Sequence, residues 1–543
     1  MPAFSVTGQI VDLHNRRIVP GVVSVAGGRI AEIVEQPGGA GGGVILPGFI
    51  DAHVHIESSM MAPSEFARFA VRHGTVATVS DPHEIANVLG IDGVRLMVAN
   101  GQQTPLKFHF GAPSCVPATR FETAGAELSA NDIAELFERD RLGYLSEMMN
   151  YPGVLAHDPL VMGKLAVAKR CGRPIDGHAP GLRGDQARQY AAAGITTDHE
   201  CFTLDEALDK IADGMRILIR EGSAAKNFAA LHPLLDSHPD ACMFCTDDLH
   251  PDALLAGQID RIVARAVAAG HDVFNVLRAA CLHPIEHYGL PVGTLRPGDP
   301  ADFIVVDDLR SFRVLSTYIN GERVFDGSSC TIGRVLCPAP NRFAAEPIAL
   351  ESLRVPDRGR AIRVIQAHDG QLITDEVRAP PRVEGGVIVA DVARDVLKIA
   401  VVNRYRPAPP AVAYIRGFGL KRGAIAASVA HDSHNVVAVG ASDSDLLAAI
   451  NAVIAMRGGL AVADGNETHR MPLELAGLMG RDGDDVAAGY ARLDAAARGL
   501  GSALTAPFMT LSFMALLVIP ALKLSDLGLF DGRRFEFASL YVD

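Results

Sequence analysis

The sequence has no excess of positive charge. Its 50 Lys and Arg residues stand against 63 Asp and Glu residues, for a formal net charge of -13. Phosphate binding needs a basic surface, so this balance argues against nucleic acid as a partner. The chain also lacks a membrane-spanning run, because its most apolar stretch, Phe513 to Leu522, is shorter than the roughly 20 residues required. We therefore expect no membrane partner.

Cysteine is also sparse: eight residues are scattered along the chain, and no secretory signal precedes them. Both features predict reduced thiols in the cytoplasm. The closest pair, Cys242 and Cys245, has an odd separation. On a β-strand that separation puts the two sulfurs on opposite faces, which argues against a redox or zinc motif.

The length of 543 residues exceeds the roughly 250 to 300 at which one core stops growing, so several domains are expected. From Phe49 onward, eight short β-type runs alternate with segments that carry apolar residues at helical spacing. Eight strand–helix units predict an α/β fold with a (β/α)8 barrel over residues 46–290. The predicted strands begin at residues 49, 76, 107, 144, 174, 196, 216 and 242.

The segments on either side of the barrel, residues 1–45 and 291–340, share a texture of short strands and turns. We expect them to pair into one small β-sandwich-like domain. A Pro-rich stretch near Pro340 marks a boundary, after which β-type runs alternate with helical segments. Residues 345–543 are predicted to form a C-terminal α/β domain.

Imidazoles and carboxylates stand at the carboxyl ends of the predicted barrel strands, where the function of such barrels is found. His53 and His55 are two residues apart on a strand and therefore point to the same face. Imidazole and carboxylate suit Zn²⁺, Fe²⁺ or Mn²⁺, and the two oxygens of Glu147 could bridge two ions. Their joint occurrence predicts a metal site with six ligands: His53, His55, Glu147, His178, His199 and Asp247.

Longer motifs surround these ligands. "PGFIDAHVH" is similar to the first-strand signature of the amidohydrolase superfamily, although many binuclear members have a carboxylated lysine where this chain has Glu147. "SDPHEIANV", "EMMNYPGV", "DGHAPGL", "CTDDLHPDAL" and "GAIAASVAHDSHN" resemble the bacterial adenine deaminases, from about residue 5 to the C-terminus. The resemblance implies purine salvage chemistry, in which water activated by two metal ions attacks C6 of adenine and releases hypoxanthine and ammonia. It implies Mn²⁺ or Fe²⁺, with Zn²⁺ as an alternative.

That reaction needs groups that move protons. Asp247 is well placed to take a proton from the attacking water and return it to the departing amine. An acid near N1 is also required, and the candidates are Glu221 and Glu200. We favour Glu221 because its strand supplies no metal ligand. Arg220, which precedes it, is a candidate for binding the purine, but consecutive strand residues face opposite ways, so we expect only one of this pair to face substrate.

Further candidates for reading the purine edges are Ser223 and the "DPHE" loop, with Asp81, His83 and Glu84. The distal "HDSHN" motif offers a second polar cluster: His431, Asp432 and His434. It either caps the barrel mouth and completes the pocket or forms a solvated loop, and the sequence leaves both alternatives open.

Two other functions are compatible with the same residues. A cyclic amide or N-acyl hydrolase would use the same barrel and most of the same ligands, because activated water also attacks carbonyl groups. A non-catalytic relative would keep the barrel for assembly. We also expect a homo-oligomer, as is common for metabolic enzymes of this size.

Overall fold

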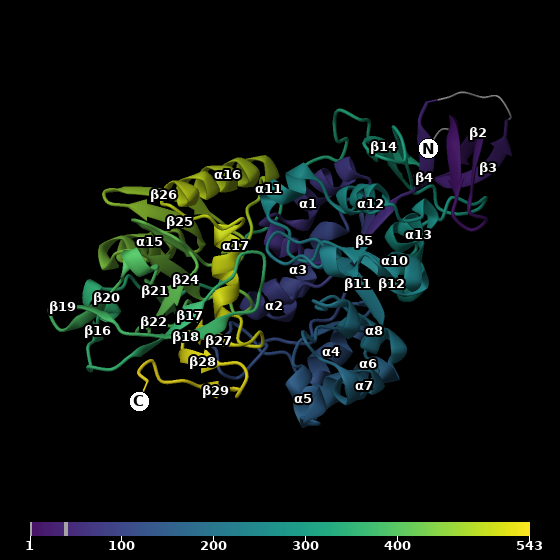
Figure 1. Ribbon diagram of the computed structural model, residues 1–543. Helices are drawn as coiled ribbons and strands as arrows, with labels where there is room; N and C mark the ends of the chain where they lie inside the picture. The colour runs from purple at the N-terminus through teal and green to yellow at the C-terminus, as the bar shows by residue number, and fades with distance from the viewer. Residues whose placement is uncertain (1–2, 37–41, 543) are drawn as a thin grey trace.

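The computed structural model describes residues 3–36 and 42–542. Figure 1 shows a small sheet beside the N-terminus, a barrel in the middle and a second mixed part that ends in the C-terminus. This arrangement confirms the fold class predicted from the sequence.

The barrel has eight parallel strands, and each of the eight predicted β-type runs overlaps one of them. Strand pairing and backbone hydrogen bonds run from each strand to the next. The ring closes where Val54 pairs with Asp247. The strands are β5 (Phe49–Val54), β6 (Thr75–Ser80), β7 (Lys107–Phe110), β8 (Leu145–Met148), β9 (Ile175–Gly177), β10 (Thr197–Asp198), β11 (Arg216–Arg220) and β12 (Cys242–Cys245).

Helices surround this barrel, and polar side chains begin several of them. Asp158 accepts from the N–H groups of Leu160 and Val161, and Ser129 forms a capping box with Asp132. The helices are α1 (Pro63–Ala70), α2 (His83–Leu89), α3 (Ile91–Gly101), α4 (Ala130–Glu138), α5 (Tyr151–Leu155), α6 (Pro159–Arg170), α7 (Gly184–Ala192), α8 (Leu204–Ala212), α9 (Phe228–Leu231), α10 (Leu234–Ser237), α11 (Pro251–Ala256), α12 (Ile259–Ala268), α13 (Val273–Leu277) and α14 (His283–Tyr288).

Segments from both sides of the barrel form one seven-stranded sheet in the order β15-β14-β13-β4-β1-β2-β3. The sheet curls, as the ring of Phe4 on β1 shows: it stacks on Tyr318 of the non-adjacent strand β14 at a centroid distance of 5.4 Å. Its strands are β1 (Phe4–Asp12), β2 (Arg17–Ala26), β3 (Arg29–Glu35), β4 (Val44–Pro47), β13 (Phe303–Val306), β14 (Val314–Ile319) and β15 (Glu322–Phe325).

The C-terminal part is built on an eight-stranded sheet in the order β18-β17-β22-β21-β24-β23-β25-β26. Helix α15 (Asp443–Met456) packs on it through Leu446, Ile450 and Val453. The sheet consists of β17 (Ile362–Gln366), β18 (Asp375–Ala379), β21 (Leu397–Val402), β22 (Ala411–Arg416), β23 (Ala424–Ala427), β24 (Val436–Gly440), β25 (Gly459–Asp464) and β26 (Glu467–Pro472).

Further elements complete this part, and among them helix α16 (Gly483–Gly499) contacts helix α11 of the barrel. The hydroxyl of Tyr490 on α16 lies 2.6 Å from Nδ1 of His250, just before α11. These elements are β16 (Val355–Pro356), β19 (Arg382–Glu384), β20 (Val387–Val389), α16 (Gly483–Gly499), α17 (Pro507–Ser512), β27 (Leu522–Ser525), β28 (Gly528–Asp531) and β29 (Glu536–Phe537).

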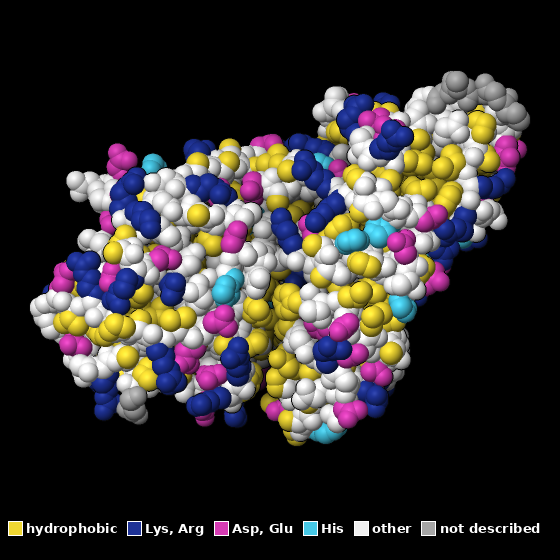
Figure 2. All heavy atoms as spheres, in the orientation of Figure 1, with side chains coloured by type: hydrophobic (Ala, Val, Ile, Leu, Met, Phe, Trp, Pro, Cys, Tyr) yellow, Lys and Arg dark blue, Asp and Glu magenta, His cyan; other side chains and the backbone are white. Residues whose placement is uncertain are grey.

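The surface carries charges of both signs. On the face in Figure 2, Lys and Arg side chains are interspersed with Asp and Glu, and a narrow furrow separates the C-terminal part from the barrel. All eight cysteines are free thiols. Among the helices in the described ranges, none has the length and apolar character needed to cross a membrane.

Candidate metal centre

Backbone pairing between the first and last barrel strands positions three of the predicted ligands. The N–H of Asp247 donates to the carbonyl of His53 at 2.9 Å, and the N–H of His55 donates to the carbonyl of Asp247 at 3.1 Å. Asp247 has a φ of 56°, a left-handed conformation that is rare for residues other than glycine. Its Oδ1 atom lies 3.1 Å from Nε2 of His55 and 3.5 Å from Nε2 of His53.

Glu147, on β8, lies at the centre of the group. Its Oε2 atom is 2.6 Å from Nδ1 of His178 and 3.1 Å from Nε2 of His199. Its Oε1 atom is 3.2 Å from Nε2 of His55. The two oxygens of one carboxylate therefore face imidazoles from opposite sides of the barrel mouth.

The donor set fits divalent metal ions. All six predicted ligands are buried. The Nε2 atoms of His53 and His55 lie only 3.0 Å apart, and Nε2 of His178 has no hydrogen-bond partner within the described ranges. Ligand atoms of His53, His55 and Asp247 lie within 4.8 Å of one another, as do those of His53, Glu147 and His199. Converging imidazole nitrogens and carboxylate oxygens are the donors that Zn²⁺, Fe²⁺ and Mn²⁺ take in proteins.

Electrostatics keep both carboxylates ionised. Burial alone would raise the pKa of Glu147, but the neighbouring His178, His199 and His55 hold that pKa well below its usual range. Burial would likewise raise the pKa of Asp247, and Arg220 with His53 and His55 reverses the shift. A carboxylate must be deprotonated to bind a metal ion, so both are prepared for that role.

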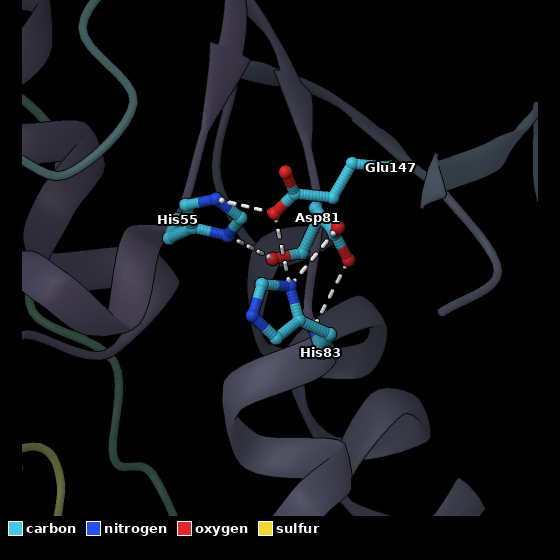
Figure 3. A group of neighbouring side chains, drawn as sticks. All are labelled: His55, Asp81, His83 and Glu147. Carbon is cyan, nitrogen blue, oxygen red and sulfur yellow. Dashed lines mark hydrogen bonds and ion pairs between the residues drawn. The ribbon is translucent and has the colours of Figure 1, made fainter. Parts of the chain in front are cut away.

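The loop after β6 adds two residues to the group. Nδ1 of His83 lies 3.0 Å from Oδ2 of Asp81 and 3.6 Å from Oε1 of Glu147. Figure 3 shows the rings of His55 and His83 turned toward Glu147, with Asp81 in the middle. Ligand atoms of these four residues also lie within 4.8 Å of one another. From the sequence, Asp81 and His83 were predicted only to contact the purine edges. Both follow the second barrel strand closely, so the rule that functional residues stand at strand ends would also have placed them near the metal ligands.

Arg220, at the end of β11, is fully buried. Its Nη1 atom pairs with Oε1 of Glu200 and lies 2.5 Å from Oδ2 of Asp247. Glu200 lines the enclosed cavity at the barrel mouth together with the ligands, and its Oε2 atom has no hydrogen-bond partner in the described part of the chain. Arg220 thus holds two carboxylates in place through Nη1, while its Nε and Nη2 atoms have no hydrogen-bond partner in the described ranges, so its role in purine binding stays a prediction.

The structure contradicts the roles predicted for Glu221 and Ser223. Glu221 pairs with Arg265 on α12 at 2.7 Å, and it lines an outer cavity together with Ser223. The hydroxyl of Ser223 accepts the N–H of His250 at 2.9 Å. Side chains alternate along a strand, so Arg220 points into the barrel and Glu221 away from it. Glu221 is therefore misplaced for the N1 acid, and Ser223 for purine contact.

The "HDSHN" motif lies in the loop between β23 and β24, and it is buried at the barrel mouth. Glu84 forms ion pairs with both His431 and His434. The side chains of His431 and Asp432 line the cavity that contains the ligands. The capping alternative therefore agrees with the structure, and Glu84 contacts the C-terminal loop.

Known proteins match the chain along its whole length. The family model described as "Amidohydrolase family" matches residues 44–324, and "Adenine deaminase C-terminal domain" matches residues 371–536. A protein named adenine deaminase from Salinibacter ruber is 58% identical over 548 residues, with 100% of both chains covered. Another from Sulfurovum sp. is 55% identical, covering 97% of this chain and 98% of that protein. A third from Methanosarcina mazei is 50% identical, covering 99% of each.

Proposed function

The chain belongs to the adenine deaminase family of amidohydrolases, and from this premise we propose how its residues convert adenine and water to hypoxanthine and ammonia. The observation that carries the proposal is the position of Glu147, whose two oxygens face His178 and His199 on one side and His55 on the other. One carboxylate between two sets of imidazoles suits a bridge between two ions.

The six buried ligands would hold two divalent ions, either Mn²⁺ or Fe²⁺. When bound, such ions lower the pKa of a water molecule so that hydroxide forms near neutral pH, and they stabilise charge that develops on the substrate. The protein contributes the ligand geometry and a cavity enclosed by buried side chains.

Two protons must move from the attacking water to the purine for the reaction to balance. Attack at C6 places negative charge on N1, and Glu200 transfers one proton from water to N1. Burial alone would raise the pKa of Glu200, but Arg220 and the histidines lower it, so this carboxylate begins ionised and can accept that proton. Asp247 takes the second proton and gives it to the amino group, which leaves as ammonia.

Arg220 and His83 support these groups. One guanidinium nitrogen of Arg220 contacts both Glu200 and Asp247, which fixes the two proton-transfer residues relative to each other. Asp81 orients His83 through the contact at 3.0 Å. The ring of His83 lies between Glu147 and the C-terminal loop and is the member of the "DPHE" loop that we place against the substrate.

The test is ammonia release by protein reconstituted with Mn²⁺ and given adenine, adenosine or hydantoin in separate reactions. We expect release from adenine and none from adenosine, with no ring opening of hydantoin. Hydantoin opening without deamination of adenine would instead support a cyclic amide hydrolase. No reaction with any of the three compounds would contradict the proposal.

A further inference from the structure

The C-terminal part of the chain forms one wall of the cavity that contains the metal ligands. His431 and Asp432 line this cavity from the β23–β24 loop, and Phe513, Leu516 and Leu372 line it from neighbouring segments. The cavity measures about 10 Å³, which is space for about one water molecule. A purine therefore enters only if apolar side chains of this wall, such as Leu372 and Leu516, move aside while the pair of His431 with Glu84 stays in place.

The ring of His431 is fixed in orientation. Its Nδ1 atom pairs with Oε1 of Glu84, and Nε2 of His434 forms an ion pair with Oε2 of the same carboxylate. The backbone N–H of Ala430 donates to Nδ1 of His434 at 3.1 Å, which assigns the proton of that ring to Nε2. Phe513 stacks on His431 at a centroid distance of 4.4 Å and an interplanar angle of 13°.

Nε2 of His431 is uncommitted, and because the ring lies between the carboxylates of Glu84 and Asp248, which favour its doubly protonated form, this nitrogen is a hydrogen-bond donor. It has no hydrogen-bond partner in the described ranges, and Oδ1 of Asp248 is 3.8 Å away. Burial alone would lower the pKa of His431, but Glu84 and Asp248 raise it to about 9, so the ring carries a proton on both nitrogens at neutral pH.

Asp432, the next residue, supplies an uncommitted acceptor in the lining of the same cavity. The residue is only 1% exposed, and its Oδ2 atom has no hydrogen-bond partner in the described part of the chain. Its Oδ1 atom lies 3.6 Å from Nε2 of His83. A buried polar atom without a partner is destabilising, so an unpaired nitrogen and an unpaired oxygen from residues that line one cavity mark a place where a polar ligand binds.

The chemistry of adenine identifies which edge would bind there. If the proposed function holds, C6 and its amino group face the metal ligands, and the opposite edge of the purine faces away from them. That edge presents an acceptor, N3, directly beside a donor, the N–H of N9. We propose that His431 donates to N3 and Asp432 accepts from N9–H, so that the C-terminal loop selects the free purine base over its nucleosides.

The selection follows from what a nucleoside lacks. In a nucleoside N9 carries the sugar and has no hydrogen, so Asp432 would be left buried and unpaired. Sites built to bond a substrate N–H reject analogues that lack it by large factors. The matched pair of ligands is adenine with 9-methyladenine, because the methyl group removes the N–H while adding little volume.

The test uses metal-loaded, full-length protein: wild type, Asp432→Ala, Asp432→Asn and the exposed control Asp485→Asn. We expect wild type and the control to prefer adenine over 9-methyladenine by at least about 100-fold in kcat/KM. Asp432→Ala should lose about 100-fold on adenine, mainly through KM, and retain less than about tenfold preference. Metal content should equal that of wild type, which separates this effect from damage to the metal centre.

Several results would overturn the inference. The inference is wrong if Asp432→Ala keeps the kcat/KM of wild type on adenine. It is also wrong if this variant prefers adenine over 9-methyladenine as strongly as wild type does. If the alanine variant does not fold, Asp432→Asn decides: its neutral amide oxygen is a weaker acceptor, so about a tenfold loss on adenine is expected and no loss is contrary. A wild type that deaminates no adenine refutes the proposed function instead. The inference is then judged by calorimetry, with hypoxanthine expected to bind wild type more tightly than Asp432→Ala and equal binding contradicting it.

Discussion

Nδ1 of His178 lies 2.6 Å from Oε2 of Glu147; Glu147 is on β8, and His178 directly follows the paired strand β9. The contact joins one side of the barrel mouth to the residue at its centre. We predict that Glu147→Gln lowers metal occupancy and deaminase activity together, because a neutral amide is a poor bridging ligand. Elemental analysis and ammonia release on the same samples check this. Full occupancy with normal turnover would show that Glu147 binds no metal.

Asp247→Asn should separate metal binding from proton transfer. The amide keeps one oxygen toward His53 and His55 but cannot accept the proton of the attacking water. We expect metal content near that of wild type and a loss of kcat of about 100-fold or more, the range for removing a general base. Near-normal turnover would assign the proton transfer to another residue.

Glu200 and Glu221 provide a matched comparison of two candidate acids. Glu200→Gln should lower kcat by about 100-fold, because Glu200 lines the cavity with the ligands. Glu221→Gln should stay within about threefold of wild type, since its partner is Arg265 in an outer cavity. Steady-state kinetics on adenine distinguish the two, and the reverse pattern would restore the assignment made from sequence.

The barrel could be predicted because its signals are local. Each strand is a short β-type run, and strand ends of a parallel barrel meet at one mouth, which is enough to bring His53 and Asp247 together across 194 positions. The same reasoning also predicted that Arg220 and Glu221 face opposite ways. Which of the two faces inward depends on the register of β11 with β12, because a shift of one residue would exchange their directions.

The role of the distal loop could not be predicted in this way. His431 meets Glu84 across 347 positions, and the contact depends on how the C-terminal sheet docks on the barrel. That docking rests on side-chain packing between the barrel and the C-terminal part, such as the contact of Tyr490 with His250. No periodicity in the chain encodes such packing, so the sequence left the capping and solvated alternatives open.

His250 should make stability depend on pH. Burial, with a smaller effect of His431, lowers its pKa to about 3. Its usual value is about 6.5, so the unfolded chain binds a proton that the folded chain excludes between these values. Its contribution to stability is complete above pH 6.5 and is lost as pH falls toward 3, with about 2 kcal/mol gone by pH 5.

The measurement is the midpoint of thermal unfolding by circular dichroism at pH 7 and pH 5, on chelator-treated wild type and His250→Gln. Chelation removes the separate effect of pH on metal binding. Wild type should lose a few degrees more than the variant over this interval. Equal losses would mean that His250 takes up its proton in the folded protein.

The most direct test is a titration of metal-free protein with Mn²⁺, in which bound metal and ammonia release from adenine are measured on the same samples. We predict no activity without metal and full activity when two ions are bound per chain, with Glu147→Gln failing to reach that level. Full ammonia release from metal-free protein would contradict a reaction at the ligands of the barrel mouth. Protein that binds no Mn²⁺ even at saturating concentrations would contradict it as well.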